Sequence, residues 1–184
     1  ADWDGTIVLD KGIGRDVNRV LATGRVDTSE QAAAMLVLRH ELTHKIGVKR
    51  DPAAYGAPWA RGLEEGLTEH HARRTWEPWV ASMGIKVNST KKPWAYEQEV
   101  GYVSALADRV ARPKKADANS VVDTWKNSVA PMQRIFKIPT DLAGAHPPAD
   151  AKKANAYRTE LRTVIITRWG DASAVDAVIK KYAS

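Results

Sequence analysis

The sequence predicts a mainly α-helical (α+β) fold with a small strand element near the N-terminus and about five to seven helices. Apolar residues recur at helical spacing in several segments, and most of these segments begin or end at residues that cap helices. One short β-rich run, Thr6 to Leu9, is followed by Asp10 and Gly12 and predicts the strand. A chain of 184 residues fits one domain, so we expect a single domain over residues 1–184.

Local capping residues place the first helices. After the strand, a short helix is expected from about Arg15 to Ala22, closed by Gly24. Thr28 and Gln31 have the spacing of a capping box, in which each side chain bonds the backbone N–H of the other residue. Apolar residues follow at helical spacing, so we expect a helix from Ser29 to Ile46.

Residues that break helices divide the rest of the chain. A second long helix should begin at Pro58, which suits a first helical position, and end near Trp76, before Glu77 and Pro78. A short strand or a loop is expected over Ile85 to Asn88. Four further helices are predicted: Tyr96 to Val110, Val121 to Phe136, Ala151 to Trp169, and a last one capped by Asp171 that ends at Tyr182.

The composition excludes several classes of function. The net charge is +6, but the basic residues are scattered in pairs, so we expect a solvated surface and no nucleic-acid partner. No apolar run approaches the roughly 18 residues that a membrane span needs. The chain has no cysteine, which excludes disulfides, thiolate metal sites and cysteine nucleophiles. Any bound metal must therefore be held by His, Asp or Glu.

The clearest motif is HELTH, residues 40–44, within the helix that the capping box begins. Residues four apart lie on one side of a helix, so His40 and His44 can bind one ion. Zinc accepts such nitrogens at roughly 2.0–2.1 Å. Glu41 lies at the edge of the same face, where it can act as general base toward a metal-activated water. Histidines four apart are usually surface residues, but the apolar flanks and the predicted helix favour a Zn2+ site.

The third ligand distinguishes the classes of protein that carry this motif. The pattern HExxHxxGxxH needs a final histidine, but Arg50 stands in its place, and Asp51 falls one residue late. The other pattern takes a glutamate from a second helix about twenty residues further on. The segment Glu-Glu-Gly-Leu-Thr-Glu, residues 64–69, supplies it, and Glu64 and Glu65 have nearly equal spacing.

HELTH followed by Glu-Gly-Leu-Thr-Glu resembles the gluzincin superfamily of zinc metallopeptidases, especially the thermolysin-like enzymes, and its Glu-Gly pair is similar to the aminopeptidase branch. The resemblance implies a minimal zincin metallopeptidase domain in which Glu65 is the third metal ligand. It also implies that Glu69 hydrogen-bonds the first ligand, His40. Glu64 would then be a surface residue, although it stays an alternative ligand. Two acids four apart, Glu65 and Glu69, would repel each other unless a positive group lies between them.

A further side chain is expected to hydrogen-bond the developing oxyanion. Tyr55 is the first candidate, because its place between the ligands is comparable to that of an active-site tyrosine in thermolysin-like enzymes. Tyr102 and His146 are the alternatives.

The resemblance implies a zinc-dependent peptidase with a peptide or protein substrate. The first alternative is a catalytically inactive zincin-like module of a larger protein. The second is a basic protein that binds nucleic acid or cell wall, in which the motif is accidental. The chain begins without Met or an apolar leader, so we expect a secreted (extracytoplasmic) protein or an excised domain of a larger bacterial or phage protein. The oligomeric state and the cleavage specificity stay open.

Overall fold

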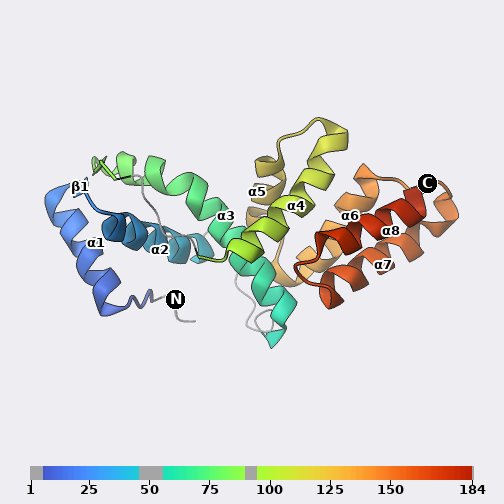
Figure 1. Ribbon diagram of the computed structural model, residues 1–184, viewed down its shortest axis with the longest axis horizontal. Coiled ribbons are helices and arrows are strands. Elements are labelled where there is room, and N and C mark those ends of the chain that lie inside the picture. The colour runs from blue at the N-terminus through green and yellow to red at the C-terminus, as the bar shows by residue number, and fades with distance from the viewer. Residues whose placement is uncertain (1–5, 46–55, 90–94, 184) are drawn as a thin grey trace. The chain divides into compact units, whose positions relative to one another are not determined.

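A computed structural model describes residues 6–45, 56–89 and 95–183. In these ranges the chain is mainly helical, as predicted, with eight α-helices, short 3₁₀ turns and one two-stranded parallel sheet (Figure 1). The chain divides into two compact units. The first unit comprises residues 1–46 and 68–95, and the second comprises residues 47–67 and 96–184. Each unit has its own hydrophobic cluster, and the single domain expected over residues 1–184 stays a prediction.

The first unit is built on helices that pack side by side. Its elements are α1 (Lys11–Thr23), β1 (Arg25–Val26), α2 (Ser29–Lys45), the later part of α3 (Pro58–Ser82) and β2 (Lys86–Val87). Helix α1 packs on α2. It begins earlier than predicted, because Asp10 Oδ1 accepts a hydrogen bond from the Gly12 N–H at 2.7 Å, and it ends at Gly24 as predicted, in the left-handed conformation.

The strands lie elsewhere than at residues 6–9. Those residues form no regular secondary structure, and Val8 is 65% exposed. The sheet pairs Val26 with Val87, and Arg25 with Lys86, which confirms the strand considered for residues 85–88. Val26 is fully buried in the cluster of the first unit, so burial favours a strand there.

The predicted capping box begins α2. Thr28 Oγ1 accepts a hydrogen bond from the Gln31 N–H at 3.3 Å, and Gln31 Oε1 accepts one from the Thr28 N–H at 3.3 Å. Gln31 Oε1 also accepts from the N–H of Asp27 at 2.7 Å. The helix therefore starts at Ser29, as predicted, and brings the HELTH segment to its last two turns.

The expected end of α3 near Trp76 is wrong, because the helix continues through Pro78 to Ser82. Ala72, Trp76 and Val80 recur every four residues, and all three are fully buried in the cluster of the first unit. A proline inside a helix costs about 3 kcal/mol. Burying a large apolar side chain contributes about 1.5–3 kcal/mol, so the buried stripe offsets the cost of an exposed proline.

The second unit contains the first part of α3 and five further helices: α4 (Glu97–Lys114), α5 (Ala118–Asn127), α6 (Arg134–Ala145), α7 (Ala154–Thr167) and α8 (Ala172–Ala183). The helix expected over residues 121–136 is in fact two, α5 and α6, because a 3₁₀ turn at Pro131–Gln133 separates them. Asp171 caps α8 as predicted, since its Oδ1 accepts from the N–H groups of Ser173 and Ala174 at 3.1 and 3.2 Å.

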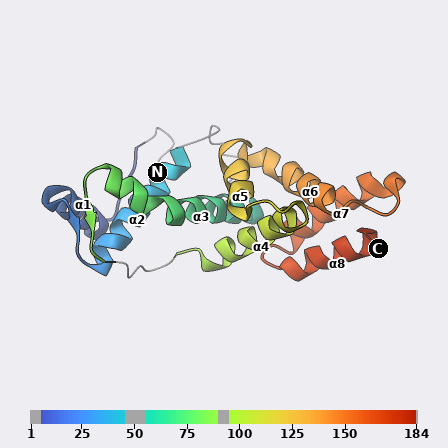
Figure 2. The same cartoon turned by 90° about the horizontal axis from the view of Figure 1, so that it is seen from above.

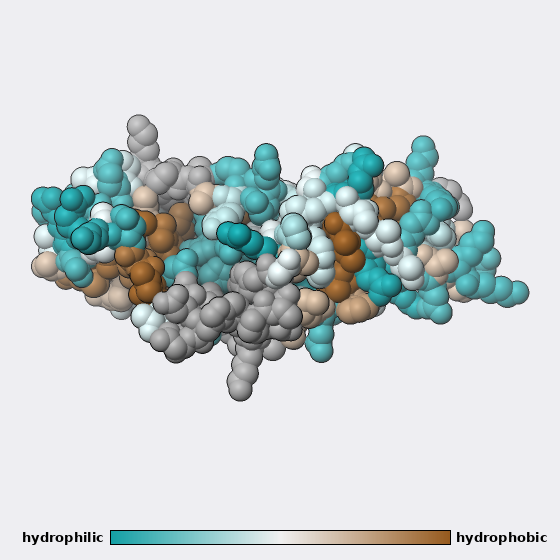
Figure 3. Space-filling model, turned by 90° about the horizontal axis from the view of Figure 1, so that it is seen from below, coloured by the Kyte–Doolittle hydropathy of each residue, from teal (hydrophilic) through white to brown (hydrophobic). Residues whose placement is uncertain are grey.

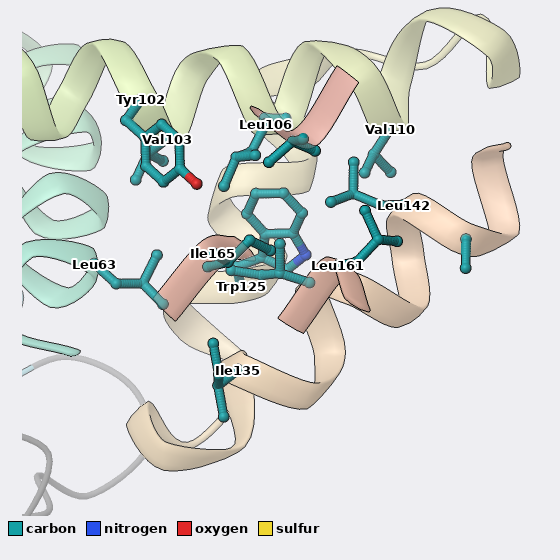
Figure 4. Packing of buried hydrophobic residues seen from close by; sticks show 14 of the residues in the cluster. Leu63, Tyr102, Val103, Leu106, Val110, Trp125, Ile135, Leu142, Leu161 and Ile165 are labelled. Carbon is teal, nitrogen blue, oxygen red and sulfur yellow. The ribbon is translucent and has the colours of Figure 1, made fainter. Parts of the chain in front are cut away.

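Trp125 lies in the middle of the core of the second unit (Figure 4). The indole is fully buried, and its Nε1–H donates to Asp141 Oδ2 at 2.8 Å. Helix α4 packs on α5 and α6, and α7 packs on α6 and α8 (Figure 2). The aliphatic side chains around the indole include Leu106, Leu142, Leu161 and Ile165.

Two glycines let α3 pack closely within the second unit. A Cβ atom at Gly66 would lie 2.8 Å from the backbone oxygen of Glu99, on α4. A Cβ atom at Gly62 would lie 2.6 Å from the Trp169 ring. Both distances are shorter than van der Waals contact, so a larger residue at either position forces its neighbours to move.

The surface is mixed in character. On the face seen in Figure 3, apolar residues form small patches among hydrophilic ones. None of the helices in the described ranges is both long enough and apolar enough to span a bilayer, as the sequence predicted.

We predict that Gly66→Ala destabilises the second unit by about 1–2 kcal/mol, because the new Cβ meets backbone that cannot rotate away. Gly101→Ala, on exposed α4 surface with open space around it, is the matched control and should stabilise by about 0.5–1 kcal/mol. Urea unfolding of both variants measures the difference. Equal stabilisation by the two substitutions would contradict the close packing at Gly66.

Candidate metal centre

Helices α2 and α3 bring four buried polar side chains together in the first unit. His40 and His44 come from the last turns of α2, and Thr68 and Glu69 come from the middle of α3. Buried polar groups are stable when they have hydrogen-bond partners, and here each one has a partner from the opposite helix.

The two imidazoles direct the same ring nitrogen at each other. Nε2 of His40 lies 3.0 Å from Nε2 of His44, and the ring centroids lie 4.7 Å apart. Two nitrogens bound to one tetrahedral zinc at roughly 2.0–2.1 Å lie about 3.3 Å apart. The two Nε2 atoms lie about 0.3 Å closer than that, at a hydrogen-bond distance, and near enough for both to bind one ion.

The other ring nitrogens are held by α3. Nδ1 of His40 lies 2.8 Å from Glu69 Oε2, and Nδ1 of His44 lies 3.3 Å from Thr68 Oγ1. The hydrogen bond that the sequence predicted between Glu69 and His40 is therefore present. An imidazole that donates its Nδ1–H keeps a lone pair on Nε2, so the contact of His40 with the Glu69 carboxylate favours the tautomer that binds a metal. The Thr68 hydroxyl can accept from Nδ1–H of His44 in the same tautomer.

Glu69 is itself held in place. Its Oε1 accepts a hydrogen bond from Nε of Arg73, one turn further along α3, at 2.9 Å. Nη2 of Arg73 in turn donates to the backbone oxygen of Ala95. The acid that orients His40 therefore has both oxygens engaged, and Arg73 supplies the opposite charge that a buried carboxylate needs.

Glu65 lies one turn before Glu69 on α3 and is 9% exposed. A carboxylate oxygen of Glu65 and one ring nitrogen each of His40 and His44 all lie within 4.8 Å of one another. Among the residues that the structure describes, this is the one group of three or more metal-binding side chains that converge. Two nitrogens and one carboxylate leave a further position open, as in catalytic zinc sites.

The sequence also predicted two catalytic residues that are not metal ligands, Glu41 and Tyr55. Glu41 is half-buried on α2, and helical geometry turns it about 100° from His40, at the edge of the ligand face. Tyr55, the first candidate for the oxyanion role, lies outside the described residues.

The two alternatives to Tyr55, Tyr102 and His146, both lie in the second unit and contact residues of that unit. Tyr102 is buried against Trp169, with the ring centroids 4.6 Å apart, and its hydroxyl has no hydrogen-bond partner among the described residues. Burial, with a smaller contribution from the charge of Asp171, raises the pKa of Tyr102 to about 12. His146 follows the last residue of α6, and its Nε2 lies 2.9 Å from the backbone oxygen of Arg109, to which it can donate.

The expectation that Glu64 is a surface residue is wrong. Its side chain is buried, with the residue 2% exposed, and both oxygens are bonded within the second unit. Oε1 accepts from Nζ of Lys126 at 3.0 Å, and Oε2 accepts from Nη1 of Arg134. Glu64 is buried because of tertiary contacts that a local pattern does not show: Lys126 and Arg134 come from helices more than sixty residues further along the chain.

Sequence reasoning missed the supporting roles of Thr68 and Arg73. Thr68 stands within the Glu-Gly-Leu-Thr-Glu segment, three residues after Glu65, and therefore on the same side of the helix. Arg73 stands four residues after Glu69, the spacing of an ion pair on a helix, so a local signal was present for both.

Comparisons with protein-family models, with curated proteins and with solved structures found no match for this chain. The gluzincin resemblance therefore stays a prediction. A function has to be inferred from the side chains around His40 and His44 themselves.

We predict that Glu64→Ala destabilises the protein by about 3–5 kcal/mol, because two buried cations lose their shared carboxylate. Glu160→Ala is the control, since Glu160 is half-buried and bonds the exposed Lys181 and the Tyr182 hydroxyl, and its loss should cost much less, about 1 kcal/mol. Chemical denaturation of the metal-free proteins measures both effects. A Glu64 variant as stable as the wild type would contradict the buried ion group.

Proposed function

We propose that the chain binds one zinc ion through His40, His44 and Glu65 and hydrolyses peptide bonds, as a gluzincin-like peptidase. The observation that carries the proposal is the buried histidine pair, with its Nε2 atoms 3.0 Å apart and each Nδ1 atom held by α3. A peptide or protein is the proposed substrate.

The chemistry of the converging atoms supports a cation at this position. When both imidazoles donate their Nδ1–H to Glu69 and Thr68, neither Nε2 carries a hydrogen. Two lone pairs and the Glu65 carboxylate then face one another in a buried place. A bound cation would take a ligand atom from each of the three groups.

The kinds of ligand favour zinc among the common metals. Imidazole nitrogen suits zinc, copper, iron and nickel, whereas calcium and magnesium take oxygen ligands. Two histidines with one glutamate form the ligand set of a catalytic zinc site with an open position. The chain has no cysteine, so the softer thiolate sites are excluded.

The side chains of the motif would divide the chemistry among them. Bound zinc would polarise the carbonyl of the peptide bond and lower the pKa of the attacking water. Glu41, beside the ligands, would take the proton from that water and pass it to the leaving amine. Glu69 and Thr68 would keep the two imidazoles oriented throughout the reaction.

We predict one zinc ion per chain after purification with zinc, and retention of that ion by Glu41→Gln. The same substitution should lower peptidase turnover by about 10²-fold or more, because it removes a general base and leaves the ligands. Elemental analysis measures the zinc content, and hydrolysis of an unstructured protein such as casein measures turnover.

Three outcomes separate the hypotheses. Zinc far below one ion per chain, even after soaking, contradicts the metal site. Full turnover by Glu41→Gln contradicts the role of that residue. Stoichiometric zinc with no hydrolysis by the wild type favours the alternative, an inactive zincin-like binding module.

We predict that Glu65→Ala weakens zinc binding most, because it removes a ligand. Glu69→Ala should weaken binding by about 10–100-fold, because His40 loses the partner that orients it. Asp108→Ala, at an exposed position of the second unit, is the control and should leave the affinity unchanged. Competition with a chelator of known affinity gives the three zinc dissociation constants. Wild-type affinity in a folded Glu69→Ala variant would be inconsistent with the proposed role of Glu69.

A further inference from the structure

Three buried charged side chains join α3 to α5 and α6 in the second unit. They are Glu64, Lys126 and Arg134, with exposed fractions of 2%, 3% and 1%. Besides its bond to Glu64, Arg134 donates from Nε to the backbone oxygen of Trp125 at 2.8 Å. Its Nη2 donates to the backbone oxygen of Lys126 at 3.0 Å. One guanidinium therefore binds both Glu64 and the C-terminal turn of α5.

Arg134 also binds backbone carbonyl groups at the end of α5. The last carbonyl groups of a helix lack intrahelical donors and carry partial negative charge. The carbonyls of Trp125 and Lys126 are two of these groups, since α5 ends at Asn127. Arg134 donates to both carbonyls and so contributes to the stability of this buried guanidinium.

This ion group constrains the rotation of α3 about its axis. Both oxygens of Glu64 are held, by donors from two different helices. Gly62 and Gly66 seat the same stretch against Trp169 and the backbone of α4, with no space for a Cβ atom. A helix that is held on these sides cannot turn without breaking buried contacts.

Because the ion group holds Glu64, it also sets the direction in which the Glu65 side chain points. Successive residues of an α-helix lie about 100° apart around the axis, so Glu65 points away from the ion group that holds Glu64. Glu69, four residues after Glu65, lies within about 40° of it around the axis, whereas Thr68 lies between the directions of Glu64 and Glu65. Those two residues bind the Nδ1 atoms of the histidines.

We infer that Glu64, Lys126 and Arg134 are positioning residues for the metal ligand Glu65. They hold α3 in the rotation that turns the Glu65 carboxylate toward the Nε2 atoms of the histidine pair, and they thereby raise the affinity for zinc. The inference rests on the proposed function, because it needs Glu65 to be a ligand.

A double-mutant cycle tests it. Glu64→Gln keeps the shape of the side chain but removes the charge that holds both cations, and it should weaken zinc binding about 10-fold, as for a lost supporting partner. In a Glu65→Ala background the same substitution should have no effect, because the residue through which it acts is gone. Chelator competition gives the zinc dissociation constants of the four proteins, each checked for native circular dichroism.

The control and a second variant keep the test decisive. Glu160→Gln, at the exposed pair with Lys181, should leave zinc affinity unchanged in both backgrounds. Lys126→Met removes one cation and keeps most of the side-chain volume, so it replaces Glu64→Gln if that variant does not fold. It should show the same dependence on Glu65.

The outcomes distinguish this inference from the proposed function. Equal weakening with and without Glu65 indicates general destabilisation and overturns the positioning role. Unchanged affinity in both Glu64→Gln and Lys126→Met also overturns it. A wild-type chain that binds no zinc overturns the proposed function, and the positioning role falls with it.

Discussion

The site and both hydrophobic clusters depend on one constraint, the fixed periodicity of α3. Leu63 and Leu67 of this helix belong to the cluster of the second unit, whereas Trp76 and Val80 belong to that of the first. Each residue advances about 100° around the axis of a regular helix. Packing at either end therefore determines the direction of every side chain between them. Glu64 and Glu65 differ in partners because they differ by one step of that rotation.

The buried glutamates of α3 between these two pairs are not explained by the stability of the fold alone. Replacing a buried ion group by apolar residues is often neutral or even stabilising, so such groups are weak evidence for a purely structural role. Here Glu64, Glu65 and Glu69 fall within six residues of one helix, and all are buried or nearly so. Glu69 orients His40, and Glu64 holds the helix to Lys126 and Arg134. The proposed metal site, which needs the Glu65 carboxylate to face the histidines, would explain why three acids lie together on this helix.

Elements defined by local chemistry could be predicted from the sequence, whereas elements defined by burial could not. The starts of α2 and α8 were predicted, because Thr28 and Asp171 bond the backbone within a few residues. The strand predicted at residues 6–9 was wrong, because the β-rich composition does not show that Val8 stays exposed. The continuation of α3 through Pro78 was missed for the same reason, since a buried stripe contributed by tertiary packing outweighs a local helix breaker.

In the candidate site, too, local features could be predicted from the sequence, whereas features set by tertiary packing could not. The convergence of His40 and His44 follows from their spacing on one helix, and the Glu69 contact follows from a motif that spans a single pair of helices. The choice between Glu64 and Glu65 is different, because two adjacent glutamates look alike in any local pattern. That choice depends on which side of α3 meets Lys126 and Arg134, and those cations lie far along the chain. A motif can therefore indicate the chemistry of a site, while the partners of Glu64 outside the motif lead us to propose Glu65 as the ligand.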